Sequence, residues 1–346
     1  MTAEKYKSAG VDLNAAEIAT KKIAALAKAT FTADVASEIG AFGGIYRYPS
    51  DSGSLLVASA DGVGTKLKVA SAVGVLNTVG QDLINHCVND ILTLGAKPLF
   101  FLDYIGYSDL GPDEIARIVE GLSIACTANG LALIGGETAQ MPGIYNSGEF
   151  DLVGFIVGTA NEDALITGEA ISPGDKLIAL ISNGLQTNGY SLARHVLLDE
   201  AKFDVGDRPE ILEGKSVWEA LLEIHPSYLH AVTALREKTE IAGMAHITGG
   251  GLPGNFSRVL PKTCDAVFDV TQIPSPPIFK LIRTEGEIEN AEMFDVFNMG
   301  AGYVIAVKPA DADRAMEILH ERGDRAVLCG EITEGKGEVI LKGIDR

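Results

Sequence analysis

One hexapeptide carries the side chains that a magnesium–triphosphate site requires. Residues 61–66 read DGVGTK and follow an apolar stretch, residues 55–60, whose composition is typical of a short buried strand. Glycines allow backbone N–H groups to approach an anion, a lysine adds a positive charge, and a carboxylate can hold a divalent cation. We therefore predict that Asp61 binds magnesium and that Lys66 contacts phosphate, next to Gly62, Gly64 and Thr65. The alternative is a surface turn with a solvated lysine; the segment is not a P-loop, because the chain contains no G-x-x-x-x-G-K-[ST] motif.

A second acidic residue follows another apolar stretch. Residues 131–134 (LALI) run into a glycine-rich segment, GGETAQMPG at residues 135–143, whereas residues 98–102 (PLFFL) end in Asp103 without glycines. Acids beside glycines at the ends of strands are suited to a magnesium–nucleotide site. We therefore expect the nucleotide to lie against the second glycine loop as well, at Gly135, Gly136, Glu137 and Thr138.

Residues 78–95 are predicted to form a helix with two contrasting sides. At about 100° per residue, Asp82, His86 and Asn89 line up on one side, and Asp90 lies about 80° from Asp82. This polar stripe has no lysine or arginine and consists of short, ligand-type side chains, so we favour a metal or phosphate site over an ordinary solvated helix face. The other side is apolar and is predicted to face the core: Val79, Leu83, Ile84, Cys87, Val88, Ile91 and Leu94.

Two glycine-rich segments in the second half of the chain each precede a predicted helix. Residues 182–190 (SNGLQTNGY) follow a predicted strand at residues 176–181, and residues 246–251 (HITGGG) lead to a helix start near Pro253. Free N–H groups at a helix N-terminus bind anions, so both segments are candidate phosphate pockets. The alternative for the triple glycine is a loop without a ligand.

Length, charge and cysteine pattern limit the class of protein. A chain of 346 residues exceeds one ordinary hydrophobic core, which predicts two domains, and no apolar run reaches the roughly 18 residues of a membrane span. A net charge of −19 argues against a nucleic-acid partner, because most of this surface would repel phosphates. The start of the chain lacks the apolar core of a signal peptide, and the four cysteines are scattered without a CxxC pair, which predicts reduced thiols in the cytoplasm.

The predicted elements indicate an α+β fold with two domains. A polar stretch with glycine and proline around residues 166–174 marks the boundary, so we predict an N-terminal domain of residues 1–168 and a C-terminal α+β domain of residues 169–346. The strands predicted in the first half leave sheet edges and an apolar face that one chain does not cover. This predicts a homodimer formed by the N-terminal half.

Taken together, these motifs resemble those of the aminoimidazole ribonucleotide synthetase family. The match runs through nearly the whole chain in the right order: YKSAGVD at 6–12, DGVGTK at 61–66, CVNDIL at 87–92, GAKPLFFLDY at 95–104, GGETAQMPG at 135–143, NGYSLAR at 188–194, HITGGGLPGN at 246–255 and FNMGAG at 297–302. The resemblance implies an ATP-dependent cyclo-ligase that converts formylglycinamidine ribonucleotide to 5-aminoimidazole ribonucleotide in purine biosynthesis.

The resemblance also implies an architecture and a set of site residues. The N-terminal domains of a homodimer are expected to share a β-barrel core and to bind ATP and magnesium, with the C-terminal domain alongside. ATP phosphorylates the formyl oxygen, an amidine nitrogen closes the ring, and phosphate leaves. Carried over to this chain, the magnesium ligands are Asp61, Asp90 and Glu137, and the catalytic residues are Asp61, Lys66 and Asp90. Asp82 and Asn89 are expected at the cofactor, and the substrate side comprises Asn188, Gly249, Gly250, Gly251 and Asn298.

Three positions depart from the family pattern. Gln140 stands where the family usually has Glu, Gln186 where it usually has His, and residues 226–228 (PSY) where it usually has Pro-Thr-Arg. Two changes remove ionisable groups and the third removes a cation suited to phosphate. We predict a divergent branch with the same reaction. The alternatives are a related ATP-dependent enzyme acting on another substrate and a non-catalytic nucleotide-binding dimer that regulates a partner.

Overall fold

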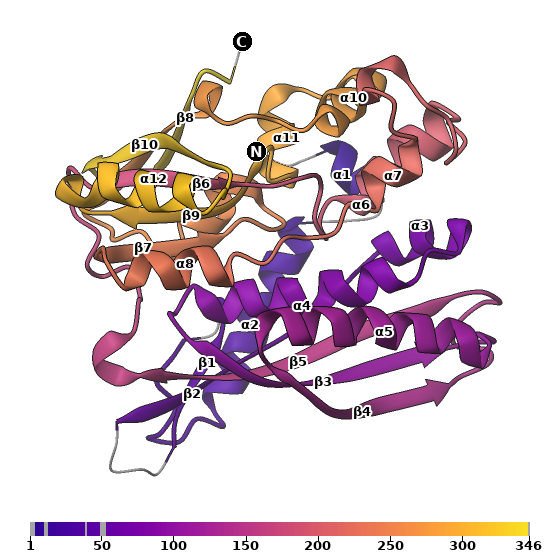
Figure 1. The fold of residues 1–346 in the computed structure, drawn as a ribbon, viewed down its shortest axis with the longest axis horizontal. Helices are drawn as coiled ribbons and strands as arrows, with labels where there is room; N and C mark the ends of the chain where they lie inside the picture. The colour runs from indigo at the N-terminus through magenta and orange to yellow at the C-terminus, as the bar shows by residue number, and fades with distance from the viewer. Residues whose placement is uncertain (1–3, 10–12, 39, 49–52, 345–346) are drawn as a thin grey trace.

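The first half of the chain is built around a five-stranded mixed sheet. The computed structural model describes residues 4–9, 13–38, 40–48 and 53–344 (Figure 1), so residues 10–12 of the YKSAGVD motif lie outside the described residues. Helices α1 (Glu4–Ser8) and α2 (Leu13–Lys28) precede the sheet, whose order is β1-β2-β5-β3-β4. β3 and β4 pair in parallel and the other neighbours are antiparallel. The strands are β1 (Gly44–Arg47), β2 (Ser54–Gly62), β3 (Lys97–Tyr107), β4 (Ala132–Gln140) and β5 (Phe150–Asn161).

Strands β2 and β4 are longer than predicted and include residues that the sequence placed in glycine loops. Asp61 and Gly62 belong to β2, and residues 135–140 belong to β4. Gly136 pairs with Asp103 of β3, and a Cβ on Gly136 would lie 2.5 Å from the Asp103 backbone oxygen. The loop prediction is wrong here because the glycine relieves crowding inside the sheet instead of ending the strand.

Helix α4 (Asn77–Leu92) lies between the first sheet and the second half of the chain, with α5 (Pro112–Asn129) beside it and α3 (Lys66–Val73) before it (Figure 1). The two long helices pack closely, since a Cβ on Gly121 would lie 2.0 Å from the Asn77 carbonyl oxygen. Both sides of α4 are covered, and its polar stripe is buried at Asp82, His86, Asn89 and Asp90. An ordinary solvated helix face is thereby excluded.

The second half forms a six-stranded sheet in the order β11-β8-β10-β6-β9-β7, in which only β11 and β8 pair in parallel. The boundary predicted at residue 168 falls between β5 and β6. The strands are β6 (Lys176–Ile181), β7 (Ile241–His246), β8 (Cys264–Asp269), β9 (Ala301–Val307), β10 (Ala326–Glu334) and β11 (Val339–Lys342). The helices are α6 (Tyr190–Arg194), α7 (Val217–Leu221), α8 (Leu229–Arg236), α9 (Gly251–Phe256), α10 (Pro277–Glu285), α11 (Asn290–Val296) and α12 (Ala312–Glu321).

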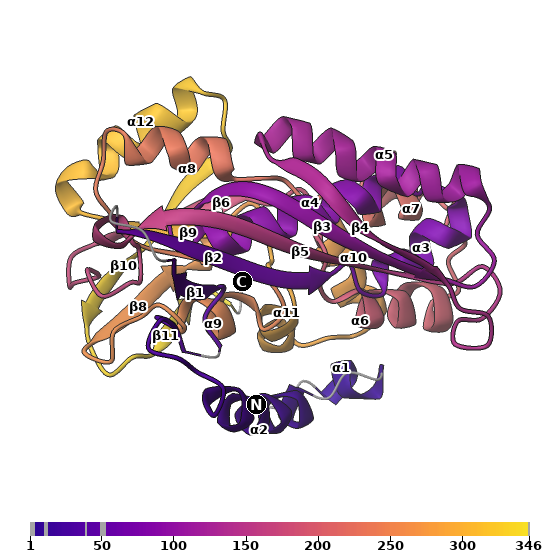
Figure 2. The same ribbon diagram turned by 90° about the horizontal axis from the view of Figure 1, so that it is seen from below.

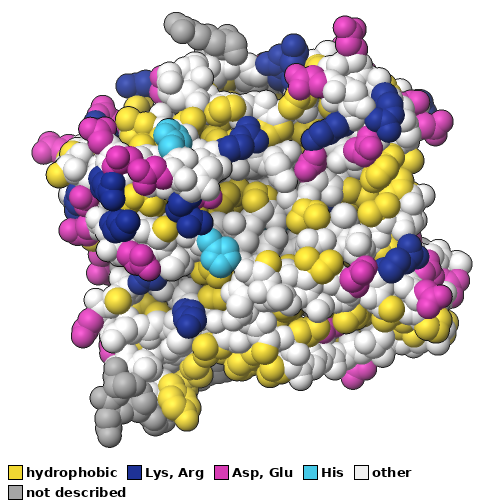
Figure 3. Space-filling view, viewed as in Figure 1, with side chains coloured by type: hydrophobic (Ala, Val, Ile, Leu, Met, Phe, Trp, Pro, Cys, Tyr) yellow, Lys and Arg dark blue, Asp and Glu magenta, His cyan; other side chains and the backbone are white. Residues whose placement is uncertain are grey.

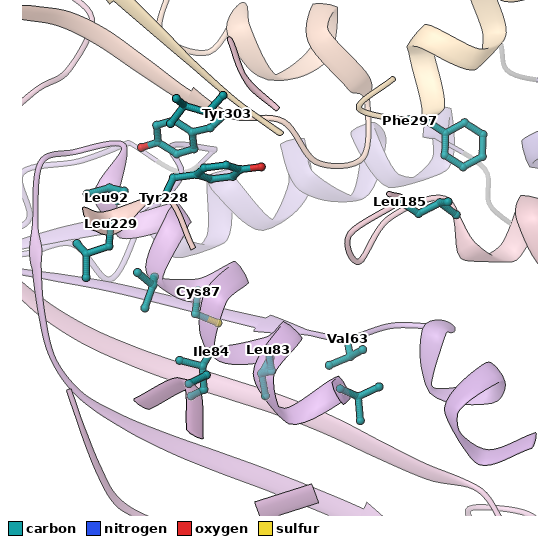
Figure 4. Packing of buried hydrophobic residues seen from close by; sticks show 14 of the residues in the cluster. Val63, Leu83, Ile84, Cys87, Leu92, Leu185, Tyr228, Leu229, Phe297 and Tyr303 are labelled. Carbon is teal, nitrogen blue, oxygen red and sulfur yellow. The ribbon is translucent and has the colours of Figure 1, made fainter. Parts of the chain in front are cut away.

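One hydrophobic core continues from the first half into the second. Figure 4 shows Leu83 and Cys87 on α4 below the rings of Tyr228 and Tyr303, whose centroids are 5.4 Å apart. All four side chains are buried. Because protein cores are close-packed, this shared core fixes the loops of the second half relative to the polar stripe of α4.

The opposite face of the first sheet carries no helix among the described residues (Figure 2). Alternation along paired strands places Phe155, Leu102 and Tyr104 on this face, away from α4, and Phe155 is 44% exposed. The sheet is open at β1 and β4, so the described part of the chain contains no closed barrel. The barrel that the resemblance implies is therefore not formed by one chain.

Candidate active site

Asp61 stands near the end of β2 with its carboxylate held at both oxygens. Oδ1 accepts the Gly62 N–H at 2.7 Å, and Oδ2 lies 2.8 Å from Nε2 of His86. The side chain is 43% exposed, so one side of the carboxylate remains open. Burial opposes ionisation of Asp61, but the charge and the hydrogen bond of His86 outweigh it and lower the pKa of this carboxyl.

His86 connects Asp61 to the second acid of the site, Asp90. The two α4 side chains are four residues apart, and His86 Nε2 lies 3.6 Å from Asp90 Oδ2. Burial disfavours the imidazolium, yet the charges of Asp61 and Asp90 raise the pKa of His86 to about 9. The structure thus brings together Asp61 and Asp90, both predicted as magnesium ligands, on either side of the positively charged ring of His86. The sequence had placed His86 only on the polar stripe of the helix.

Two further histidines, which sequence reasoning did not select as site residues, complete the network. His246 at the end of β7 places Nδ1 at 2.7 Å from Asp90 Oδ1 and Nε2 at 3.0 Å from His225 Nε2. Thr187 Oγ1 lies 2.7 Å from His86 Nδ1 and 3.4 Å from His225 Nδ1. The only sequence signals were the position of His246 at the start of the triple-glycine motif and that of His225 directly before the divergent PSY segment.

Lys66 is entirely buried and does not face an open phosphate site. Its Nζ forms an ion pair with Asp82 at 2.7 Å and donates to the backbone oxygens of Glu223 at 2.7 Å and Gln186 at 3.1 Å. Burial lowers the pKa of Lys66 and raises that of Asp82, while the ion pair opposes both shifts. Since an ammonium group has three protons, these three partners leave none for a phosphate. The predictions that Lys66 contacts phosphate and that Asp82 contacts the cofactor do not fit this geometry.

Asn89 and Asn298 hold loops together instead of facing an open site. Asn89 Oδ1 accepts the Tyr228 N–H at 2.9 Å, and its Nδ2 donates to a neighbouring backbone oxygen. Asn298 Oδ1 accepts the Ser182 hydroxyl at 2.7 Å, and its Nδ2 donates to the Gly184 oxygen at 2.9 Å. Both side chains are buried. Their predicted contacts with cofactor and substrate are therefore not what the structure provides, because their polar atoms are used within the fold.

The other predicted substrate-side segments do meet the network. Asn188 Nδ2 donates to Thr187 Oγ1 at 3.3 Å, and Asn188 Oδ1 lies 3.3 Å from where a Cβ on Gly249 would stand. Gly250 has a φ of 95° and Gly251 a φ of 57°, which favour glycine at both positions. The triple-glycine segment begins at His246, which contacts Asp90, so it lies next to the acidic cluster. Its contact with substrate, like that of Asn188, remains a prediction that the geometry permits. In the DGVGTK segment, the Thr65 hydroxyl lies 3.1 Å from that of Ser191.

Glu137 is not part of this cluster. Strands β2, β5, β3 and β4 are adjacent, and one row of paired residues crosses them: Asp61, Gly154, Asp103 and Gly136. At about 4.8 Å between neighbouring strands, β4 lies about 14 Å from β2. Glu137 is the next residue after Gly136, so its side chain points to the opposite face of the sheet from Asp61. One chain therefore does not assemble the predicted magnesium ligands Asp61, Asp90 and Glu137. The stretch Gly135–Thr138 is exposed on the edge strand.

The departures Gln140 and Gln186 both make hydrogen bonds inside the fold. Gln140 Nε2 donates to the Ser108 oxygen at 3.0 Å, and Gln186 Nε2 donates to the Tyr228 hydroxyl at 2.9 Å. Gln186 is buried and has a φ of 64°. Gln186 and Tyr228 thus form a pair, which the sequence showed only as two separate departures.

Changing Gln186 to His should alter turnover by less than about tenfold, because an imidazole N–H can replace the amide donor to Tyr228. The pH–rate profile should gain no ionisation. We would measure both from pH 5.5 to 9, assuming an unperturbed histidine pKa of about 6.5 as reference. A large gain in rate with a new inflection near that pH would assign proton transfer to this position.

Comparison with known proteins gives a consistent result over the whole chain. Residues 42–160 match the family model "AIR synthase related protein, N-terminal domain", and residues 172–342 match the corresponding C-terminal domain. The chain is 46% identical over 335 residues to a phosphoribosylformylglycinamidine cyclo-ligase of Myxococcus xanthus, covering 96% of this chain and 97% of the relative. It is 42% identical over 344 residues to one of Brevibacillus brevis, covering 99% of each.

A solved structure of the hydrogenase maturation protein HypE in complex with ATP has a similar fold. Its TM-score is 0.61 and its sequence identity is 16%, with 86% of this chain and 84% of that chain covered. At this identity the likeness concerns the fold alone.

Proposed function

Because this chain belongs to the family of AIR synthase related proteins, we propose that it is a phosphoribosylformylglycinamidine cyclo-ligase, an ATP-dependent enzyme of purine biosynthesis. The observation that carries this conclusion is identity of 46% and 42% to cyclo-ligases over almost the entire length of both partners. The α+β fold with two sheets agrees with it. The three departures, Gln140, Gln186 and residues 226–228, lie within a chain that otherwise keeps the motifs quoted above.

The reaction requires that a poor leaving group be made a good one. An amide oxygen does not leave readily, so the γ-phosphoryl group of ATP is transferred to the formyl oxygen of the substrate. An amidine nitrogen then forms a bond to the activated carbon, and the carbon–oxygen bond breaks with release of phosphate. Such phosphoryl transfer depends mainly on positioning and on stabilisation of charge.

The carboxylates of Asp61 and Asp90 fit a magnesium ion, which prefers oxygen ligands. They lie on either side of His86, Asp61 is partly exposed, and the Ser59 hydroxyl is 3.5 Å from Asp90 Oδ2. Magnesium would supply positive charge to the phosphates there. His86 and His246 orient the two carboxylates, and Lys66 ties the DGVGTK segment to the second half through the carbonyl of Glu223.

ADP release measured with and without formylglycinamidine ribonucleotide tests the proposal. Stimulated release with formation of 5-aminoimidazole ribonucleotide is the expected result, and it should require magnesium. Nucleotide binding without turnover would instead favour a non-catalytic dimer. Turnover that the ribonucleotide does not stimulate would favour a related enzyme with another substrate.

We further propose that two copies associate through the open face of the first sheet. Phe155, Leu102 and Tyr104 leave an apolar surface there, and the edge strand β4, which among the described strands pairs only with β3, is suited to continued pairing. Glu137 lies on this same face, next to Tyr104 in the neighbouring strand. If Glu137 contacts the nucleotide as predicted, it would therefore do so at the interface between the two copies.

Changing Phe155 to Glu should convert the dimer to a monomer, because it places a charge in the middle of this apolar face. Leu328→Glu is the matched control, since Leu328 is 45% exposed on the second sheet. Sedimentation velocity at micromolar concentration measures the change. A monomeric parent protein, or a Phe155→Glu variant that remains dimeric, would contradict this assembly.

The surroundings of the enzyme are inferred from its surface and its thiols. In the described residues no helix combines the length and the hydropathy needed to cross a bilayer. All four cysteines are buried free thiols, which fits the predicted reducing, cytoplasmic location. Basic and acidic side chains are interspersed on the face shown in Figure 3, consistent with a small-molecule substrate rather than a nucleic acid.

A further inference from the structure

We propose that His86, His225 and His246 form a binding site for one divalent transition-metal ion of the zinc class. This goes beyond the proposed function, which calls only for magnesium at carboxylate oxygens. Imidazole nitrogen is a preferred ligand of Zn²⁺, whereas Mg²⁺ prefers oxygen. The site lies directly behind Asp61 and Asp90, between α4 and the second half of the chain.

The spacing of the three rings matches that of three imidazoles around one ion. One nitrogen of each ring can be chosen so that all three lie within 4.8 Å of one another. The ring centroids are 4.9, 5.0 and 5.5 Å apart. With a metal–nitrogen distance of about 2.0–2.1 Å and tetrahedral angles, the centroids of ligating imidazoles are separated by about 5 Å. The rings also approach from different directions, with interplanar angles between 46° and 87°.

The outer partners are those that metal-binding histidines usually have. A ligating imidazole generally donates its second N–H to a carboxylate or a carbonyl, which orients the ring. His246 does so to Asp90 at 2.7 Å, and His86 to Asp61 at 2.8 Å. These bonds direct His246 Nε2 and His86 Nδ1 toward the centre of the cluster. The hydroxyl of Thr187 lies beside the same centre, where its oxygen could serve as a fourth ligand next to the three nitrogens.

His225 and His246 approach each other closely through their Nε2 atoms. Asn89 is fixed by the backbone of residues 226–228 so that its Nδ2, which can only donate, lies 3.2 Å from His225 Nε2. On binding an ion, His225 Nε2 would exchange this contact with Asn89 for the metal, next to His246 Nε2, which lies 3.0 Å away. Two nitrogens on one tetrahedral ion lie about 3.3 Å apart at metal–nitrogen distances of about 2.0–2.1 Å, which is close to the separation of these two Nε2 atoms. A metal ion bound by both rings accounts for this close approach, and a proton shared between the two rings is the competing explanation.

The placement of the three rings predicts how a bound ion would affect stability. His86 would give up its Nδ1 proton on binding. Because His86 belongs to α4 and the other two histidines to the second half, the ion would also cross-link these parts, so thermal stability should rise with loading.

The test uses the untagged full-length protein, freed of metal with a chelator and titrated in excess magnesium. We expect one Zn²⁺ per chain by calorimetry, a rise in the thermal midpoint, and a visible spectrum typical of tetrahedral cobalt when Co²⁺ replaces Zn²⁺. His225→Gln should weaken zinc binding by at least about 100-fold, since even changes to outer partners cost about 10–100-fold. His230→Gln is the control, because His230 is exposed five residues further on.

Absence of stoichiometric zinc binding by the parent protein overturns the proposal and leaves a shared proton between His225 and His246. Binding that excess magnesium abolishes, or that His225→Gln leaves unchanged, overturns it as well. If His225→Gln does not fold, the cobalt spectrum of the parent protein decides, because nitrogen ligation in a four-coordinate site differs from octahedral oxygen ligation. All of these readouts are independent of cyclo-ligase activity, so failure of this inference and failure of the proposed function remain distinguishable.

Discussion

Replacing Asp61 with Asn is expected to reduce substrate-dependent ADP release by about 10³-fold, which corresponds to a loss of several kcal/mol of charge stabilisation in the transition state. Asn keeps the size of the side chain and one oxygen, but it removes the charge that would hold magnesium. The partly exposed position should leave the free energy of unfolding within about 1 kcal/mol of the parent value. Steady-state ADP release over a range of magnesium concentrations, together with thermal unfolding, measures both effects.

Asp163→Asn serves as the matched control, because Asp163 is exposed and comes just after β5, a strand of the same sheet. It should leave turnover and magnesium dependence unchanged. A near-normal rate for Asp61→Asn would show that Asp61 is only a hydrogen-bond partner of His86. Loss of folding would instead assign the carboxylate a mainly structural role.

Replacing Lys66 with Met should lower the free energy of unfolding by about 3–5 kcal/mol, because it leaves the buried carboxylate of Asp82 without its ion-pair partner. The other Asp82 oxygen accepts the His225 N–H at 2.7 Å. Adding Asp82→Asn retains an acceptor for that bond and removes the unpaired charge, so the double variant should regain part of the loss. Urea denaturation of the three proteins measures the difference.

Lys176→Met provides the comparison with an exposed ion pair. Lys176 lies 2.8 Å from Glu331 at the surface, and its loss should cost less than about 1 kcal/mol. If Lys66→Met kept the stability of the parent and raised only the KM for ATP, the lysine would contact phosphate as the sequence predicted, and the buried ion pair would have to open during catalysis.

The sequence located the first two acids of the site for a sound reason. Asp61 and Asp90 were found because a strand end and a helix stripe each impose a regular direction on side chains. Periodicity could not show that the second half covers the polar side of α4, which turns Asp82 and Asn89 toward the interior. For the same reason Lys66, whose partners Glu223 and Gln186 are more than a hundred residues away, was assigned to phosphate.

Glycine was the other source of error. Glycines beside an acid occur both in phosphate loops and where strands approach closely, and the sequence does not separate the two cases. In this chain Gly136 accommodates Asp103, and β4 continues past it, which turns Glu137 to the open face. The clustering of His225 and His246 could not be predicted either, since it depends on packing between a loop and the end of β7.

The most direct test of the central claim follows the formyl oxygen of formylglycinamidine ribonucleotide. The substrate would be labelled at that atom with a heavy oxygen isotope and incubated with the enzyme, ATP and magnesium. The mechanism predicts that every turnover transfers the label to inorganic phosphate, as seen by mass spectrometry, while 5-aminoimidazole ribonucleotide forms in equal amount. Formation of that product with the label released to water would contradict phosphorylation of the formyl oxygen, and ADP release without the product would contradict the cyclo-ligase itself.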